Sequence, residues 1–100
     1  MTKLIAYYKA PENKDEFEKK YFDEHLPLAK KMPGLLKCEI MKLKGLGGTE
    51  PKFFMQADMY FENEDSLNKA MSSEEGRAAG KNLMSFAKEH VTMYIGVEQE

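Results

Sequence analysis

The sequence has one cysteine, no tryptophan and no long run of apolar residues. Because Cys38 is alone, an intrachain disulfide is excluded, which agrees with a reducing compartment. No segment approaches the ~20 apolar residues of a membrane-spanning helix, and the N-terminus lacks the apolar core of a signal peptide. We therefore expect a cytoplasmic protein without a membrane partner.

Positive charge is also scarce, with 15 Lys and Arg against 17 Asp and Glu and a formal net charge of −2. Nucleic acids attract proteins through a positive field, so this balance argues against a nucleic-acid partner. His25 and His90 do not form a metal-ligand spacing, and no nucleotide or flavin motif is present. We therefore expect no metal and no cofactor.

What is present is typical of a globular chain. Hydrophobic residues make up 42% and charged residues 32% of the 100 residues. These values are far from those of a disordered chain, and the length suits one ordinary domain. We expect a single domain over residues 1–100.

Apolar periodicity predicts four strands, over residues 3–9, 35–44, 52–62 and 91–97. Asn13 and Glu16 are placed to start a first helix, which Pro33 ends. Asn63 and Ser73 are placed to cap the two halves of a second helical region. The order βαββαβ predicts an α+β, ferredoxin-like fold with a four-stranded antiparallel sheet and both helical regions on one face.

The third predicted strand has one apolar face and a second face that mixes aromatic and polar residues. Its alternation assigns five residues to the helix side: Phe53, Met55, Ala57, Met59 and Phe61. The second face would carry Phe54, Gln56, Asp58 and Tyr60, with Tyr94 from the last strand and one of Tyr7 and Tyr8 from the first. An exposed aromatic face usually marks an interface or a ligand groove, so we expect a homodimer that covers it. The alternative is a monomer in which this aromatic face of the sheet is exposed to solvent.

His25 is the main candidate for chemistry. It lies in the apolar stripe of the first helix, where Pro27 removes a backbone donor and should bend the helix. Such a bend would turn the imidazole toward the rim of the sheet, where it can serve as a general acid or base near neutral pH. The alternative is a core histidine satisfied by a backbone carbonyl.

The segment Tyr21–Leu28 (YFDEHLPL), followed by Lys31–Gly34, resembles the signature helix of the EthD family. Residues 3–9 and Ser73–Gly76 resemble the same family, so the resemblance covers nearly the whole chain. It implies a dimeric α+β barrel. The family is named for a protein linked to bacterial degradation of ethyl tert-butyl ether beside an oxidative system. Some fungal relatives are associated with dehydration or decarboxylation of aromatic polyketides.

Together these features predict an EthD-type enzyme that acts on a small, partly apolar organic molecule between the sheet and the first helix. The expected chemistry belongs to the catabolism of organic compounds, either as cofactor-free oxidation or as dehydration or isomerisation, in an oxidoreductase or a lyase. We assign catalysis to His25, Asp58 and Tyr60. We assign substrate binding to Tyr7, Phe54, Gln56 and Tyr94.

Three alternatives remain open from the sequence. The chain could bind a ligand without turning it over, as an accessory protein of an oxidative degradation system. It could be a purely structural dimer whose aromatic face is a dry interface. Asp58, finally, could be a solvated strand residue or a salt-bridge partner of Lys42 or Lys44.

Overall fold

The computed structural model describes residues 1–100. Its elements are β1 (Thr2–Tyr8), α1 (Lys14–Lys20), the π-helical turn η1 (Tyr21–His25), α2 (Leu26–Ala29), β2 (Lys37–Lys42), the short 3-10 turn η2 (Leu46–Gly48), β3 (Met55–Phe61), α3 (Glu64–Ser72), α4 (Glu74–Ala87) and β4 (Val91–Val97). The strands form one sheet in the order β2-β3-β1-β4, and every neighbouring pair is antiparallel. This confirms the predicted α+β, ferredoxin-like fold.

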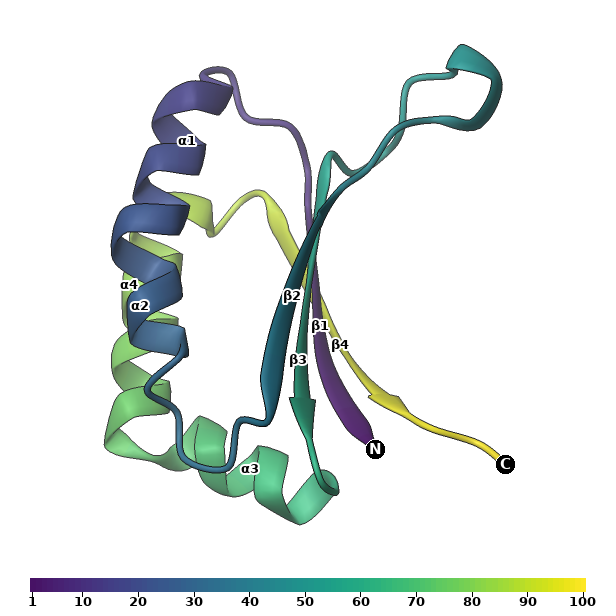
Figure 1. The fold of residues 1–100 in the computed structure, drawn as a ribbon. Coiled ribbons are helices and arrows are strands. Elements are labelled where there is room, and N and C mark those ends of the chain that lie inside the picture. The colour runs from purple at the N-terminus through teal and green to yellow at the C-terminus, as the bar shows by residue number, and fades with distance from the viewer.

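The two faces of the sheet differ in what covers them. Figure 1 shows all the helices on one face, with α1 and α2 beside α4, while the opposite face carries no helix. The connection between β2 and β3 projects beyond the sheet, and its Leu46 is 95% exposed. One sheet face is therefore open in the single chain, as the pattern of β3 predicted.

The helix starts follow from short polar side chains. Asn13 Oδ1 accepts a hydrogen bond of 3.0 Å from the N–H of Glu16, which confirms the predicted cap of α1. Asn63 caps α3 in the same way, and Ser73 Oγ accepts 3.0 Å from the N–H of Gly76 at the start of α4. The corner before α4 is tight, because a Cβ on Gly76 would lie 2.0 Å from the carbonyl oxygen of Ala70.

The first helical region widens in its middle. The N–H of Leu26 donates to the carbonyl of Tyr21, five residues back, instead of four as in an α-helix. Pro27 follows directly and has no N–H to donate. The irregularity predicted near His25 is thus confirmed as a π turn, and His25 is its last residue.

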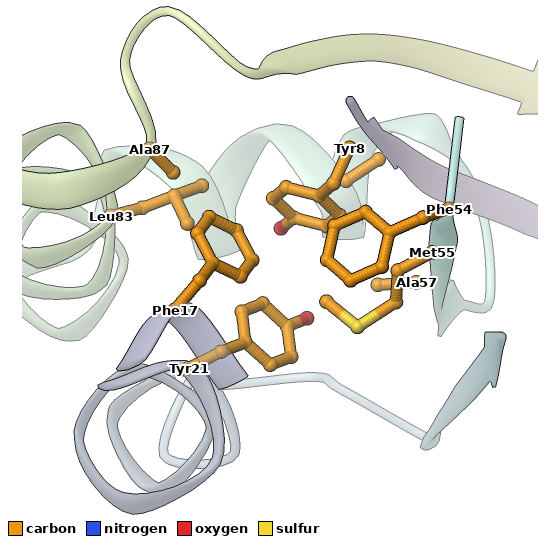
Figure 2. Packing of buried hydrophobic residues seen from close by; sticks show 9 residues of the cluster. Tyr8, Phe17, Tyr21, Phe54, Met55, Ala57, Leu83 and Ala87 are labelled. Atoms are coloured by element: carbon orange, nitrogen blue, oxygen red, sulfur yellow. The ribbon is translucent and has the colours of Figure 1, made fainter. Parts of the chain in front are cut away.

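An aromatic cluster joins the helices to the upper half of the sheet (Figure 2). Phe17 lies at its centre, with its ring 5.7 Å from those of Tyr8 and Phe54 and 5.3 Å from Phe86. Tyr21 stacks on Phe17 at 6.4 Å. A second, mostly aliphatic cluster fills the other half and contains Leu4, Ala29, Met32, Met59, Phe61, Leu67, Ala70 and Ala79.

The register of β3 confirms most of the predicted faces and corrects one pair. Ala57 lies opposite Ala6 of β1, and both are fully buried on the helix side. Phe54, however, is buried in the aromatic cluster, while Phe53 contacts Tyr7 on the open face at 5.2 Å. The prediction for these two residues was wrong because the regular strand begins only at Met55, so strict alternation does not extend to them.

Candidate functional site

A cavity of about 360 Å³ lies between the helix side of the sheet and the helices. Its wall comes from β1, β3 and β4 on one side and from η1, α2, α3 and α4 on the other. The wall includes five methionines, Met32, Met59, Met71, Met84 and Met93, together with Leu4, Ala29, Ala79 and Leu83. Methionine side chains are flexible and polarisable, so a cavity lined by them can adapt to apolar ligands of different shapes.

His25 is part of this wall, at the end of the π turn. The residue is only 4% exposed, and its ring lies 5.3 Å from that of Tyr21. Its Nδ1 atom is buried and has no hydrogen-bond partner. Burial lowers the pKa of His25, although hydrogen bonding to the Ala79 backbone, as the core-histidine alternative expected, and to the Asn82 side chain acts in the opposite direction. The imidazole is therefore neutral at pH 7.

Asn82 connects α4 to the π turn beside His25. Its Nδ2 donates to Glu24 Oε1 at 3.4 Å, while its Oδ1 is buried without a partner. Buried polar atoms without partners are costly and uncommon in folded proteins. Two of them, on His25 and Asn82, lie in this region of the fold. Sequence reasoning missed Asn82, since nothing in the pattern of α4 sets it apart from a surface amide.

Tyr8 is a second polar group in the cavity wall. Burial raises the pKa of its hydroxyl, although a hydrogen bond with the Tyr21 side chain acts in the opposite direction, so the hydroxyl stays protonated. Tyr7, which was predicted to bind the substrate, lies on the open face beside Tyr94, and Tyr8 was not among the predicted site residues. The alternation of β1 could have identified Tyr8. Adjacent strand residues point to opposite faces, so Tyr8 shares the helix side with Leu4 and Ala6.

Asp58 lies on the open face of the sheet, away from the cavity. Lys3 Nζ is 3.5 Å from its Oδ2, and Gln56 Nε2 donates to its Oδ1 at 2.9 Å. Asp58, which was predicted to act in catalysis with His25, therefore does not share a site with it within one chain, because the sheet separates them. The salt-bridge alternative holds with a different partner, since Lys42 pairs with Glu18.

Tyr60 belongs to the same open face. Its hydroxyl donates to Glu39 Oε1 at 2.5 Å, and the Nζ atoms of Lys3 and Lys37 lie 4.7 and 4.5 Å from the centre of its ring. The hydrogen bond from Tyr60, followed by the charge of Lys37, lowers the pKa of Glu39. Tyr60 is thus engaged in a network on the open face and does not line the cavity with His25.

The predicted binding residues are divided in the same way. Tyr7 and Tyr94 lie together on the open face with their rings 6.1 Å apart, and Gln56 lies on that face beside Asp58. Phe54 is in the core. Of the seven residues selected from the sequence, the structure places only His25 in the wall of the cavity.

The described chain offers no group of three or more His, Cys, Asp or Glu side chains placed to hold a metal ion. None of its helices combines the length and the apolar character of a transmembrane segment.

Comparison with solved structures shows which proteins share this fold. An EthD family protein of Bacillus halodurans is 41% identical, with 99% of each chain covered and a TM-score of 0.94. A dimeric ferredoxin-like protein from Jannaschia is 12% identical over 97% of this chain and 98% of its own, with a TM-score of 0.72. SnoaB of Streptomyces nogalater, a cofactor-independent oxygenase, is 10% identical over 99% and 93%, with a TM-score of 0.71.

Sequence comparison agrees with this. An uncharacterised 11.0 kDa protein of Rhodococcus erythropolis, from the thcB–thcC intergenic region, is 28% identical over 99% of this chain and 96% of its own. The model of the EthD domain matches residues 9–90, which include the π turn, His25 and the whole of α4. The chain therefore belongs to the EthD family.

Proposed function

We propose that this protein is an enzyme that transforms a small, partly apolar organic molecule in the cavity, with His25 accepting a proton from it. One observation carries the proposal: a buried, neutral imidazole with an unpartnered Nδ1 stands in the wall of a largely apolar cavity. A neutral imidazole at pH 7 is a base in its reactive form.

Two further features support a reaction in this cavity. The Tyr8 hydroxyl is held protonated and can donate a hydrogen bond to a carbonyl or a developing oxyanion of the substrate. SnoaB, a cofactor-independent oxygenase with the same fold, favours cofactor-free oxidation over dehydration or isomerisation as the reaction class. In this proposal Tyr8 takes the place that the sequence analysis gave to Asp58 and Tyr60.

A ligand-binding protein would use the same cavity, and turnover separates the two functions. The experiment incubates the protein with a panel of partly apolar phenols, ketones and organic acids, and follows their consumption by mass spectrometry. A Gly80→Met variant provides the control, because Gly80 lines the cavity and has open space around its Cβ position. Product that forms with the wild type and not with this variant supports the enzyme. Saturable binding without product contradicts it.

The pH dependence of turnover is a direct prediction of the lowered pKa of His25. A general base must be unprotonated, so kcat/KM is expected to be constant above pH 7 and to fall at acidic pH. The midpoint of the fall should lie below 6.5, the ordinary pKa of histidine, because burial disfavours the charged form. A pH–rate profile between pH 4.5 and 9 checks this. Activity that rises toward acidic pH would instead make His25 an acid.

We further propose that the open sheet face forms the interface of a homodimer. Beside its polar network this face carries exposed or half-buried apolar side chains, among them Ile5, Tyr7, Met41 and Tyr94, and Tyr94 is 57% exposed. The Jannaschia neighbour, described as dimeric, supports this arrangement. We expect a dimer in sedimentation velocity at micromolar concentration and a shift toward monomer in Tyr94→Arg. A wild-type monomer at these concentrations contradicts the proposal.

A further inference from the structure

Two cations stand one helical turn apart in the cavity wall. Arg77 and Lys81 both come from α4, both contribute to the wall, and both residues are exposed. Neither forms an ion pair, although five other ion pairs are present in the chain. The charged groups of both side chains are therefore without an ion-pair partner, on exposed residues of the cavity wall.

This arrangement is unfavourable for the helix by itself. Like charges at positions i and i+4 repel each other and weaken a helix. No Asp or Glu contributes to the cavity wall that would offset them. The wall therefore carries two positive charges while the whole chain has a net charge of −2. A local positive field of this kind at an apolar opening attracts an anion.

We infer that the ligand of the cavity is an amphiphilic organic anion, with its charged group between Arg77 and Lys81 and its apolar body among the methionines. The inference rests on the proposed function, because it concerns the ligand of the same cavity. An Arg guanidinium binds a carboxylate through paired hydrogen bonds, and a Lys ammonium adds a point charge. The charged group stays near solvent, and the apolar body extends inward toward His25 and Tyr8.

Two fluorescent probes with the same aromatic body test the inference. 8-Anilinonaphthalene-1-sulfonate carries one negative charge, and N-phenyl-1-naphthylamine is its neutral counterpart. We expect the wild type to bind the anion more tightly than the neutral probe. In the double variant Arg77→Gln/Lys81→Gln, the Kd of the anionic probe is expected to rise about tenfold at low ionic strength. The Kd of the neutral probe should change less than about twofold, because its contacts are apolar.

The matched control is Lys30→Gln/Lys31→Gln, which removes the same charge from exposed positions outside the cavity wall. It should leave the Kd of both probes within about twofold, because these two charges lie outside the cavity wall and act on a bound probe only through solvent of high dielectric constant. Circular dichroism confirms that all variants remain folded. An equal loss for both probes, or no loss for the anion, in the Arg77/Lys81 variant overturns the inference and leaves the proposed function standing.

The Gly80 position separates failure of the inference from failure of the proposed function. Gly80→Met should weaken both probes by filling the cavity, whereas Gly80→Ala adds one methyl in open space and should weaken them far less. If neither probe binds the wild type, or if Gly80→Met leaves both affinities unchanged, the cavity is not their site. That result overturns the inference, while the turnover experiment with the substrate panel decides the proposed function.

Discussion

Replacement of His25 by glutamine is expected to lower the turnover of the substrate by about 10²–10⁴-fold, the usual contribution of a positioned general acid or base. Glutamine has a similar size and retains hydrogen bonding, but its amide does not accept a proton at neutral pH. The loss should therefore appear in kcat, with a smaller change in KM, because the apolar contacts of the cavity remain. Steady-state kinetics of both parameters check this result.

His90→Gln is the matched control, since His90 lies outside the cavity wall, and its ring centroid is 6.1 Å from that of Phe17 in a T-shaped arrangement. Its turnover should stay within about twofold of the wild type. Turnover of His25→Gln equal to that of this control would remove His25 from the mechanism.

A second measurement on His25→Gln needs no substrate. The pKa of His25 is lower in the folded chain than in the unfolded one. The contribution of the neutral imidazole to the free energy of unfolding is therefore fully present above about pH 6.5, and it declines as the pH falls. Urea unfolding of His25→Gln should show a weaker loss of stability between pH 7 and pH 5 than the wild type does.

Removal of the Phe17 side chain is expected to lower the free energy of unfolding by about 3–5 kcal/mol, the range for Phe→Ala in well-packed cores. Phe17 is 4% exposed and lies at the centre of the aromatic cluster that joins α1, α4 and the sheet (Figure 2). The rings around it are fixed by other contacts, so they cannot collapse fully into the space. Urea unfolding of Phe17→Ala measures the change.

Phe22→Ala is the control for this prediction, because Phe22 is in the same helical region but is 38% exposed. Its loss should be at most half of that for Phe17→Ala, since less apolar surface returns to water. Equal losses in the two variants would contradict the central position of Phe17 in the core.

The fold was largely predictable because local and periodic signals agree. Asn13, Asn63 and Ser73 cap the helices where the sequence analysis placed them, and the period of two identified the buried face of β3. The exception is Phe53 and Phe54. They precede the regular strand, so side-chain alternation gives no information about which of them enters the core.

The site was less predictable because it depends on which face of the sheet each residue takes. His25 was identified from its position beside Pro27, and the structure places it in the cavity wall. Asp58 was assigned to catalysis with His25, but it lies on the other face of the sheet, where Lys3 and Gln56 satisfy its carboxylate. Arg77 was not considered, since a single cation on an exposed helix face resembles any other until the cavity beside it is known.

The π turn also explains a regularity in the sequence. The buried residues Phe17, Tyr21, His25 and Ala29 recur at intervals of four. On an unbroken α-helix, with about 100° per residue, each interval overshoots a full rotation by about 40°, so three intervals accumulate a drift of about 120°. A wider turn holds more residues per rotation and reduces this drift.

The angular position of His25 therefore depends on how many residues the turn contains as well as on which residues they are. Loss of one residue from Tyr21–His25 would close the π turn to an ordinary α turn and leave Phe17 and Ala29 eleven residues apart, about 20° beyond three full rotations, so both keep their faces. Gain of one residue would instead rotate the two flanking segments relative to each other by about 100°, and either Phe17 would leave the aromatic core or Ala29 would leave the cavity wall. We expect this segment to tolerate the loss of one residue far better than the gain of one.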